Sequence, residues 1–187
     1  MPVSSDAARP PLSSNRVSRT LQHRRHFSII CNMLVDPSNL AIALQKAVST
    51  ATDRIAALQG VAELIKSSGN YRWVGLYDVD QAAGTVTNIV WAGPGASEYP
   101  TFPITKGLTA SAISRKTVNV GDVDADPRYL TAFGTTKSEI IVPVLDREGE
   151  KVLGTIDVES EVPSAFSEDV QALLESCSKI IRPLWQR

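Results

Sequence analysis

The sequence predicts an α+β fold in which an antiparallel sheet carries helices on one side. Two pairs of apolar, β-branched segments are each joined by a turn, which is typical of β-hairpins. Segments with apolar residues at three- and four-residue steps lie at both ends of the domain and predict amphipathic helices. With 187 residues, 43% of them hydrophobic and 21% charged, the chain is long enough for one domain with a substantial core.

Residues 1–35 are predicted to be a disordered basic tail or an upstream extension, and residues 36–187 a single domain. Residues 1–32 hold five arginines and one aspartate, whereas the remainder holds 14 basic and 19 acidic residues. Such a Ser- and Pro-rich basic segment buries too little surface to fold. A twin-arginine-like or transit-like signal is the alternative, as is translation from Met33. We expect a cytoplasmic location.

The first helix is predicted to begin at Asp36, the N-cap, with Pro37 at the first helical position. Its apolar pattern runs to Leu58, and Gly60 is expected to interrupt it before a second helical piece. Residues 72–79 and 85–91 then form the first predicted hairpin around a turn at residues 80–84.

The middle of the chain, residues 92–137, is rich in loops. We expect a short helix over residues 107–116, a short strand around residues 118–120, and a long irregular stretch over residues 121–137. The last helix is predicted to begin after Ser167 as N-cap, with acids in its first turn, and to end near Pro183.

The second hairpin, residues 138–160, carries acids where apolar residues are expected. Glu139 lies near the start of its first strand, and Asp157 and Glu159 lie near the end of the second. Antiparallel pairing brings these two ends to the same edge of the sheet. Three carboxylates there form either a solvated rim or a site for a cation or a hydrogen-bond donor.

Composition narrows the classes of function. A net charge of −1 gives no bulk attraction to nucleic acid, and no apolar run approaches the ~20 residues that span a bilayer. Cys31, Cys177 and two histidines are too few for a usual zinc site. Asp122, Asp124 and Asp126 lack the glycine and final glutamate of a calcium loop. We therefore predict no metal site and no cofactor.

From Arg72 to Ile181 the chain resembles a GAF domain. Five motifs carry the resemblance: residues 73–77 (WVGLY), residues 126–129 (DPRY) after Asp122, residues 138–144 (SEIIVPV), residues 153–157 (LGTID) and residues 166–169 (FSED). The resemblance implies a central antiparallel sheet of about six strands, helices on one face, and a ligand pocket on the other.

Within that family the chain is most similar to the free methionine-(R)-sulfoxide reductases. The resemblance implies that Glu139, Asp157 and Glu159 hold the amino group of a free amino acid. It also places Thr109 and Ala132 where those enzymes carry cysteines, and no cysteine lies between positions 32 and 176. Sulfoxide reduction needs a thiolate and a resolving thiol, so we predict no catalytic residues.

The sequence thus predicts a sensor-type GAF domain that binds a small molecule, signals through a partner, and is a catalytically silent relative of the reductases. The predicted ligand-binding residues are Glu139, Asp157, Glu159, Trp91, Tyr99, Thr109, Tyr129 and Ser138. An enzyme with unconventional residues and a ligand-free dimerisation module are the alternatives. Apolar stripes on the terminal helices favour a homodimer. Because buried unpaired carboxylates are costly, we expect the empty pocket to be open to water.

Overall fold

The computed structural model describes residues 37–130 and 133–186. The predictions for residues 1–35, the N-cap role of Asp36 and the placement of Ala132 lie outside the described residues. The helices are α2 (Pro37–Ser49), α3 (Arg54–Ser68), α4 (Thr109–Ala112) and α5 (Glu168–Ile181), with 3₁₀ turns η1 (Val123–Ala125) and η2 (Arg182–Trp185). The strands are β1 (Trp73–Asp80), β2 (Thr85–Ala92), β3 (Thr101–Pro103), β4 (Val118–Val120), β5 (Ser138–Leu145) and β6 (Val152–Ser160).

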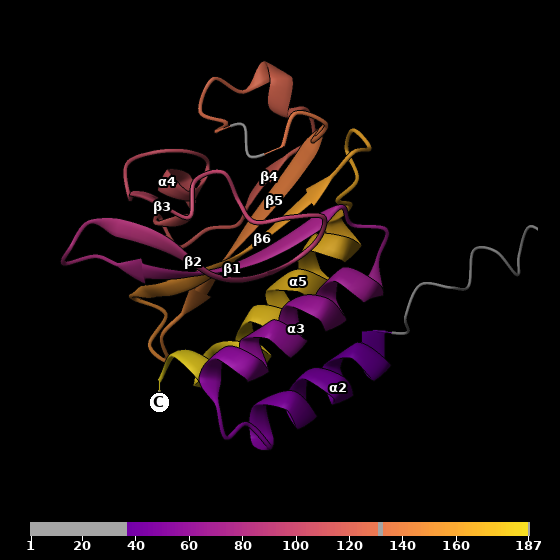
Figure 1. Ribbon diagram of the computed structural model, residues 1–187, viewed down its shortest axis with the longest axis vertical. Helices are drawn as coiled ribbons and strands as arrows, with labels where there is room; N and C mark the ends of the chain where they lie inside the picture. The colour runs from indigo at the N-terminus through magenta and orange to yellow at the C-terminus, as the bar shows by residue number, and fades with distance from the viewer. Residues whose placement is uncertain (1–36, 131–132, 187) are drawn as a thin grey trace, which may run out of the picture. The chain divides into compact units, whose positions relative to one another are not determined.

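The six strands form one antiparallel sheet in the order β3-β2-β1-β6-β5-β4. The three long helices, α2, α3 and α5, lie together on one side of it, and α4 lies on the other (Figure 1). The predicted α+β class, with helices on one face of an antiparallel sheet, is therefore confirmed. No helix in the described part of the chain is long and apolar enough to cross a membrane.

Alternation along the two central strands separates the two faces of the sheet. Ile140, Val142 and Val144 of β5 point toward the helices, as do Ile156 and Val158 of β6, and all five are almost fully buried. The intervening residues of both strands point to the opposite face, where they include the three acids. The helix-facing residues of both strands belong to the main hydrophobic core and stabilise the fold through their burial.

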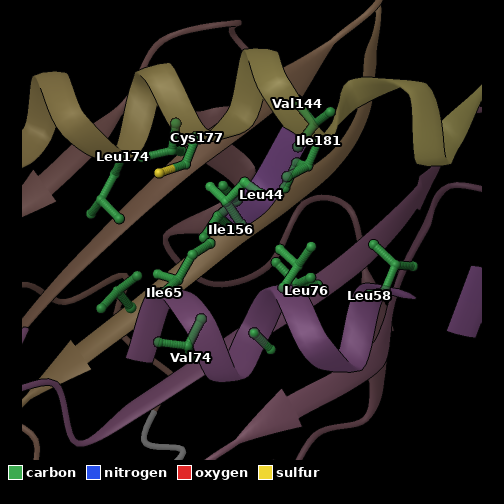
Figure 2. Close-up of a cluster of buried hydrophobic side chains, with 14 of the residues drawn as sticks. Leu44, Leu58, Ile65, Val74, Leu76, Val144, Ile156, Leu174, Cys177 and Ile181 are labelled. Atoms are coloured by element: carbon green, nitrogen blue, oxygen red, sulfur yellow. The ribbon is translucent and has the colours of Figure 1, made fainter. Parts of the chain in front are cut away.

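The core between sheet and helices contains Cys177. Figure 2 shows its sulfur among Leu44, Leu174 and Ile156, with α5 on one side and β6 on the other. Burial raises the pKa of this thiol to about 12, so it stays protonated at neutral pH. Cys177 is a core residue, as free cysteines commonly are.

The first helical region breaks earlier than the sequence predicted. The α2 helix ends at Ser49, and the hydroxyls of Ser49 and Thr50 donate to the carbonyl of Lys46 at 3.1 and 2.9 Å. The α3 helix then begins with Asp53 as N-cap, whose carboxylate accepts from the amide of Ala56 at 2.6 Å. Gly60 lies inside α3, so the prediction of a break there was wrong.

The loop region is also more ordered than its composition indicates. The helix expected over residues 107–116 is only one turn long, since α4 covers Thr109–Ala112. Left-handed residues lie on both sides of it, Gly107 with φ 70° and Arg115 with φ 69°. The stretch predicted to be irregular contains η1, and β3 adds an edge strand. The N-cap role of Ser167 is confirmed by its bond from the amide of Val170.

A pair of glycine substitutions tests this packing. Nothing lies within 4 Å of a Cβ added at Gly60, so Gly60→Ala is expected to raise the free energy of unfolding by about 0.5–1 kcal/mol. A Cβ added at Gly154 would overlap the backbone oxygen of Tyr77 and the indole of Trp185. Gly154→Ala is therefore expected to lower it by about 2 kcal/mol.

Urea unfolding of both variants measures these effects. If a helix instead ended at Gly60, Gly60→Ala would lower the free energy of unfolding. The sign of the change in this free energy therefore distinguishes the two helix boundaries.

Candidate ligand-binding site

The register of β5 and β6 brings the three acids together. Glu139 stands directly opposite Glu159, and Ile141 stands opposite Asp157. Asp157 and Glu159 are two residues apart on one strand and therefore share a face with Glu139. All three are buried, with exposed fractions of 8% for Glu139, 4% for Asp157 and 2% for Glu159. The predicted convergence of the strand ends thus produces a buried acidic cluster.

The acids line a small cavity on the sheet face opposite the long helices. Its walls combine β1, β5 and β6 with the segments around β3 and α4, and its lining residues are Tyr77, Ser97, Tyr99, Phe102, Gly107, Leu108, Thr109, Leu130, Glu139, Ile141, Asp157 and Glu159. Its volume is about 30 Å³, little more than one water molecule needs. The expectation of a pocket open to water was wrong, because the loops close over the carboxylates.

Burial makes these carboxyl groups hard to ionise. It is the main reason that the pKa of Glu139 lies well above its ordinary value, and the charges of Glu159 and Asp157 raise it further. Burial also raises the pKa of Asp157 to about 7, partly offset by the hydroxyls of Thr155 and Thr109. The pKa of Glu159 is likewise about 7. At neutral pH the cluster therefore keeps part of its protons and carries less negative charge than three ordinary carboxylates.

The acids differ in how their oxygens are satisfied. The hydroxyl of Thr136 donates to Glu159, and the Arg72 guanidinium nearby favours the charged form of that carboxyl. By contrast, Oδ1 of Asp157 is fully buried and accepts no hydrogen bond of regular geometry from the described residues, although the Thr155 and Thr109 hydroxyls lie close enough to lower its pKa. A buried acceptor without a donor costs about 1–3 kcal/mol. Nowhere in residues 37–130 and 133–186 do His, Cys, Asp or Glu side chains form a group of three suited to a metal ion.

The other predicted site residues divide into two groups. Tyr99 and Thr109 line the cavity with the acids. Trp91, Tyr129 and Ser138 are not among its lining residues. Trp91 is 37% exposed at the end of β2, and Tyr129 packs beside Leu108 and Ile141. The Ser138 hydroxyl donates to the carbonyl of Val162 at 2.7 Å and so fixes the chain after β6.

Sequence reasoning missed Tyr77, which lines the cavity from β1. Burial raises its pKa well above the ordinary value, and the nearby Asp157 carboxyl adds to the shift. Its ring contacts those of Trp73 and Phe102, with centroids 6.3 and 6.0 Å apart. The signal was the alternation of β1, which puts Tyr77 on the face shared by Trp73 and Gly75.

A GAF domain model matches residues 53–182, and the chain belongs to the GAF family. It is 34% identical over 110 residues to the free methionine-R-sulfoxide reductase of Saccharomyces cerevisiae, in an alignment covering 58% of this chain and 60% of the yeast protein. GAF domain-containing protein A of Dictyostelium discoideum is 29% identical over 146 residues, with 76% of this chain and 88% of that protein covered.

Solved structures show the same two kinds of relative. The free methionine-R-sulfoxide reductase from Neisseria meningitidis in complex with its substrate superimposes with a TM-score of 0.72 at 29% identity, covering 80% of this chain and 88% of that one. A solved GAF domain superimposes with a TM-score of 0.71 at 25% identity, covering 79% and 85%. The similarity to GAF domains and to free methionine-R-sulfoxide reductases that the sequence indicated is therefore confirmed.

The acidic cluster predicts an unusual pH dependence of stability. Because the folded-state pKa values of Glu139, Asp157 and Glu159 exceed their unfolded values, the folded state binds more protons above about pH 4. Stability is therefore fully present below that pH and is lost as pH rises through about 7. The free energy of unfolding, measured by urea titration, is expected to fall between about pH 5 and pH 8.

Neutral variants provide the check on that profile. Asp157→Asn and Glu139→Gln are expected to flatten it and to raise the melting temperature at about pH 8. Glu148→Gln, in the exposed β5–β6 turn, serves as the matched control and leaves the slope unchanged. A wild-type profile that is flat or rises across this range would contradict the assigned pKa directions.

Proposed function

We propose that this GAF domain binds a small molecule carrying an ammonium group, a free amino acid of the methionine type, and acts as a sensor without reductase activity. The observation that carries the proposal is the cluster of three buried acids that line one cavity, among which Oδ1 of Asp157 accepts no hydrogen bond of regular geometry from the described residues. An ammonium group supplies both the missing donor and the missing positive charge.

The relatives support this choice of ligand. The Neisseria structure is of a free methionine-R-sulfoxide reductase with its substrate, and the Saccharomyces relative bears the same name. In this chain Glu139, Asp157 and Glu159 would hold the amino group, while the Tyr77 and Phe102 rings offer apolar surface to the rest of the molecule. Thr109 offers a hydroxyl that donates to a bound oxygen.

Binding of an amino acid requires the cover to open. The cavity of about 30 Å³ is far below the ~300 Å³ at the lower end of small-molecule sites. Tyr99, Gly107 and Leu130 belong to the covering segments, and Tyr99 is already 42% exposed. In this proposal the ligand replaces the protons on the acids and the segments close over it, which gives the domain two states to report to a partner.

Catalytic silence is supported by the residues that the structure describes, because none of them brings a thiol to the cavity. Cys177 lies in the helix-side core, across the sheet from the cavity, and its pKa of about 12 leaves it unreactive. Cys31 and Ala132 both lie outside the described residues. The Thr109 hydroxyl is far too weakly acidic to attack sulfur as a thiolate does.

Ligand binding is tested by calorimetry and thermal melting with methionine and the R-sulfoxide of free methionine. We expect stabilisation by one of them, and Glu139→Gln is expected to weaken binding by about 1.5–3 kcal/mol. The same substitution raises the stability of the empty protein, so weaker binding cannot be attributed to unfolding. If neither compound shifts the melting temperature or gives heat, the amino-acid proposal fails.

Catalytic silence has its own assay. Dithiothreitol- or thioredoxin-driven reduction of the free sulfoxide is expected to stay at the level of a protein-free blank, because no described thiol reaches the cavity. Turnover well above the blank that disappears in Cys177→Ala or Cys31→Ala would contradict it and favour an enzyme with unconventional residues.

The homodimer stays a proposal, and fewer exposed apolar residues are available for pairing than the sequence predicted. The predicted N-terminal stripe comprised Leu40, Leu44, Val48, Ala51 and Ile55. The first three are buried in the domain's own core, and Ala51 packs against it. Ile42 and Ile55 remain largely exposed on the helical face. Light scattering at about 50 µM is expected to give twice the monomer mass. A monomer mass at that concentration would contradict the dimer proposal. A cytoplasmic location likewise stays a prediction, since the targeting alternatives concern residues 1–35.

A further inference from the structure

A second cavity of about 640 Å³ lies outside the acidic site. It is a groove between the α5 helix and the end of β5, where the edge strand β4 has already stopped. The β4 strand pairs only with residues 139–141 of β5, so Val142 and Pro143 continue past it along the groove. The β5–β6 turn and residues 115–117 complete the walls. Its volume falls in the ~300–1,000 Å³ range of small-molecule sites.

Positive charge gathers around this groove. Arg115 and Lys116 line one wall, Arg147 lies in the turn, and Lys179 and Arg182 project from the end of α5 and the start of η2. The side chains of Arg115, Lys116, Arg147 and Lys179 form no ion pair or hydrogen bond with any described residue. Arg182 donates to the backbone carbonyl of Asp146 at 3.1 Å, which fixes its position while leaving its charge uncompensated. The groove thus holds five cations with no bound counter-charge.

The acids in the groove are occupied elsewhere or exposed. The carboxylate of Asp146 accepts from the amides of Glu150 and Lys151 within its own turn, at 2.8 and 3.1 Å. Glu175 accepts from the Thr117 hydroxyl at 2.6 Å and from the Gln171 amide at 2.9 Å. Glu148 alone remains, in the exposed turn. Five basic against three acidic side chains make the groove positive, whereas residues 33–187 as a whole are acidic.

We propose that this groove is a second binding site, for a small polyanion that carries at least two phosphate or carboxylate groups. Cations on three sides suit separated anionic groups, and guanidinium groups pair with phosphate or carboxylate through two parallel hydrogen bonds. The rest of the domain is acidic and repels anions, so the positive groove is the place where an anion is attracted.

Other occupants fit the groove less well. Residues 1–32 of this chain carry five arginines and one acid, so their net positive charge is repelled by the positive groove. A second copy would bring one positive groove against another. An extended peptide that adds to the edge of β5 meets Pro143, which has no amide hydrogen to donate.

The backbone at Arg115 makes a clean test possible. Its φ of 69° is left-handed, a conformation that glycine adopts at lower cost than arginine. Arg115→Gly therefore removes a cation without straining the fold. Lys179→Gln removes a second cation from an exposed position on α5. Lys46→Gln, at the exposed end of α2, is the matched control outside the groove.

The experiment titrates the full chain with pyrophosphate, citrate and inorganic phosphate by calorimetry at a fixed ionic strength of about 0.1 M. We expect saturable binding of pyrophosphate or citrate. Arg115→Gly with Lys179→Gln is expected to weaken it about tenfold, while Lys46→Gln and Glu139→Gln leave it unchanged. The arm that binds more tightly identifies phosphate or carboxylate as the recognised group.

Several outcomes overturn the proposal. Absence of saturable binding for all three anions would do so, as would equal affinity of the double variant and wild type. Binding of an octaglutamate peptide but of neither small polyanion would assign the groove to a protein partner instead. Because Glu139→Gln lies in the other site, failure here leaves the amino-acid proposal standing, and the reverse also holds.

Discussion

The direct opposition of Glu139 and Glu159 across β5 and β6 is the constraint on which the rest of this structure depends. Like charges in that arrangement destabilise a sheet, and here both are also buried. Formation of the core nevertheless requires this register, because the same two strands turn Ile140, Val142 and Val158 toward the helices. A one-residue slip would expose those residues, so the register holds and the acids stay paired on the other face.

Protonation of the acids reduces the repulsion between them. Burial moves the pKa values of Asp157 and Glu159 to about 7, and that of Glu139 well upward, so the site carries less than its full negative charge at neutral pH. Partial protonation reduces the cost of burial, but Oδ1 of Asp157 still accepts no hydrogen bond of regular geometry from the described residues. The cluster therefore costs stability in the ligand-free protein, and local rules of this kind are commonly broken at functional sites.

Much of this was visible in the sequence because it depends on period-two alternation and short-range turn chemistry. The Asp146 to Gly149 turn fixed the β5–β6 hairpin, and with it the meeting of Glu139, Asp157 and Glu159. The position of the helix break was also encoded, because Asp53 is a favourable N-cap residue; the predicted break at Gly60 rested on the low helix propensity of glycine. Gly60 is tolerated inside α3 because tertiary packing outweighs its low helix propensity.

What could not be predicted depends on long-range closure. The loops around Tyr99, Gly107 and Leu130 come from three separate segments, and no local pattern indicates that they meet over the acids. Trp91 and Tyr99 looked equivalent as aromatic residues in loops, yet only Tyr99 reaches the cavity. The basic groove was equally hidden, since Arg115, Arg147 and Lys179 are spread over 65 positions and converge only because β4 stops short beside α5.

Three carboxyl groups are buried together in this fold, and their raised pKa values keep protons on them up to near-neutral pH. Carbon-13 NMR of the side-chain carboxyl carbons, followed through a pH titration of the ligand-free protein, measures this directly. The structure predicts that Asp157 and Glu159 titrate at about 7 and that Glu139 titrates well above 4.5. Midpoints for all three near the ordinary values of 3.8 for aspartate and 4.5 for glutamate would contradict it.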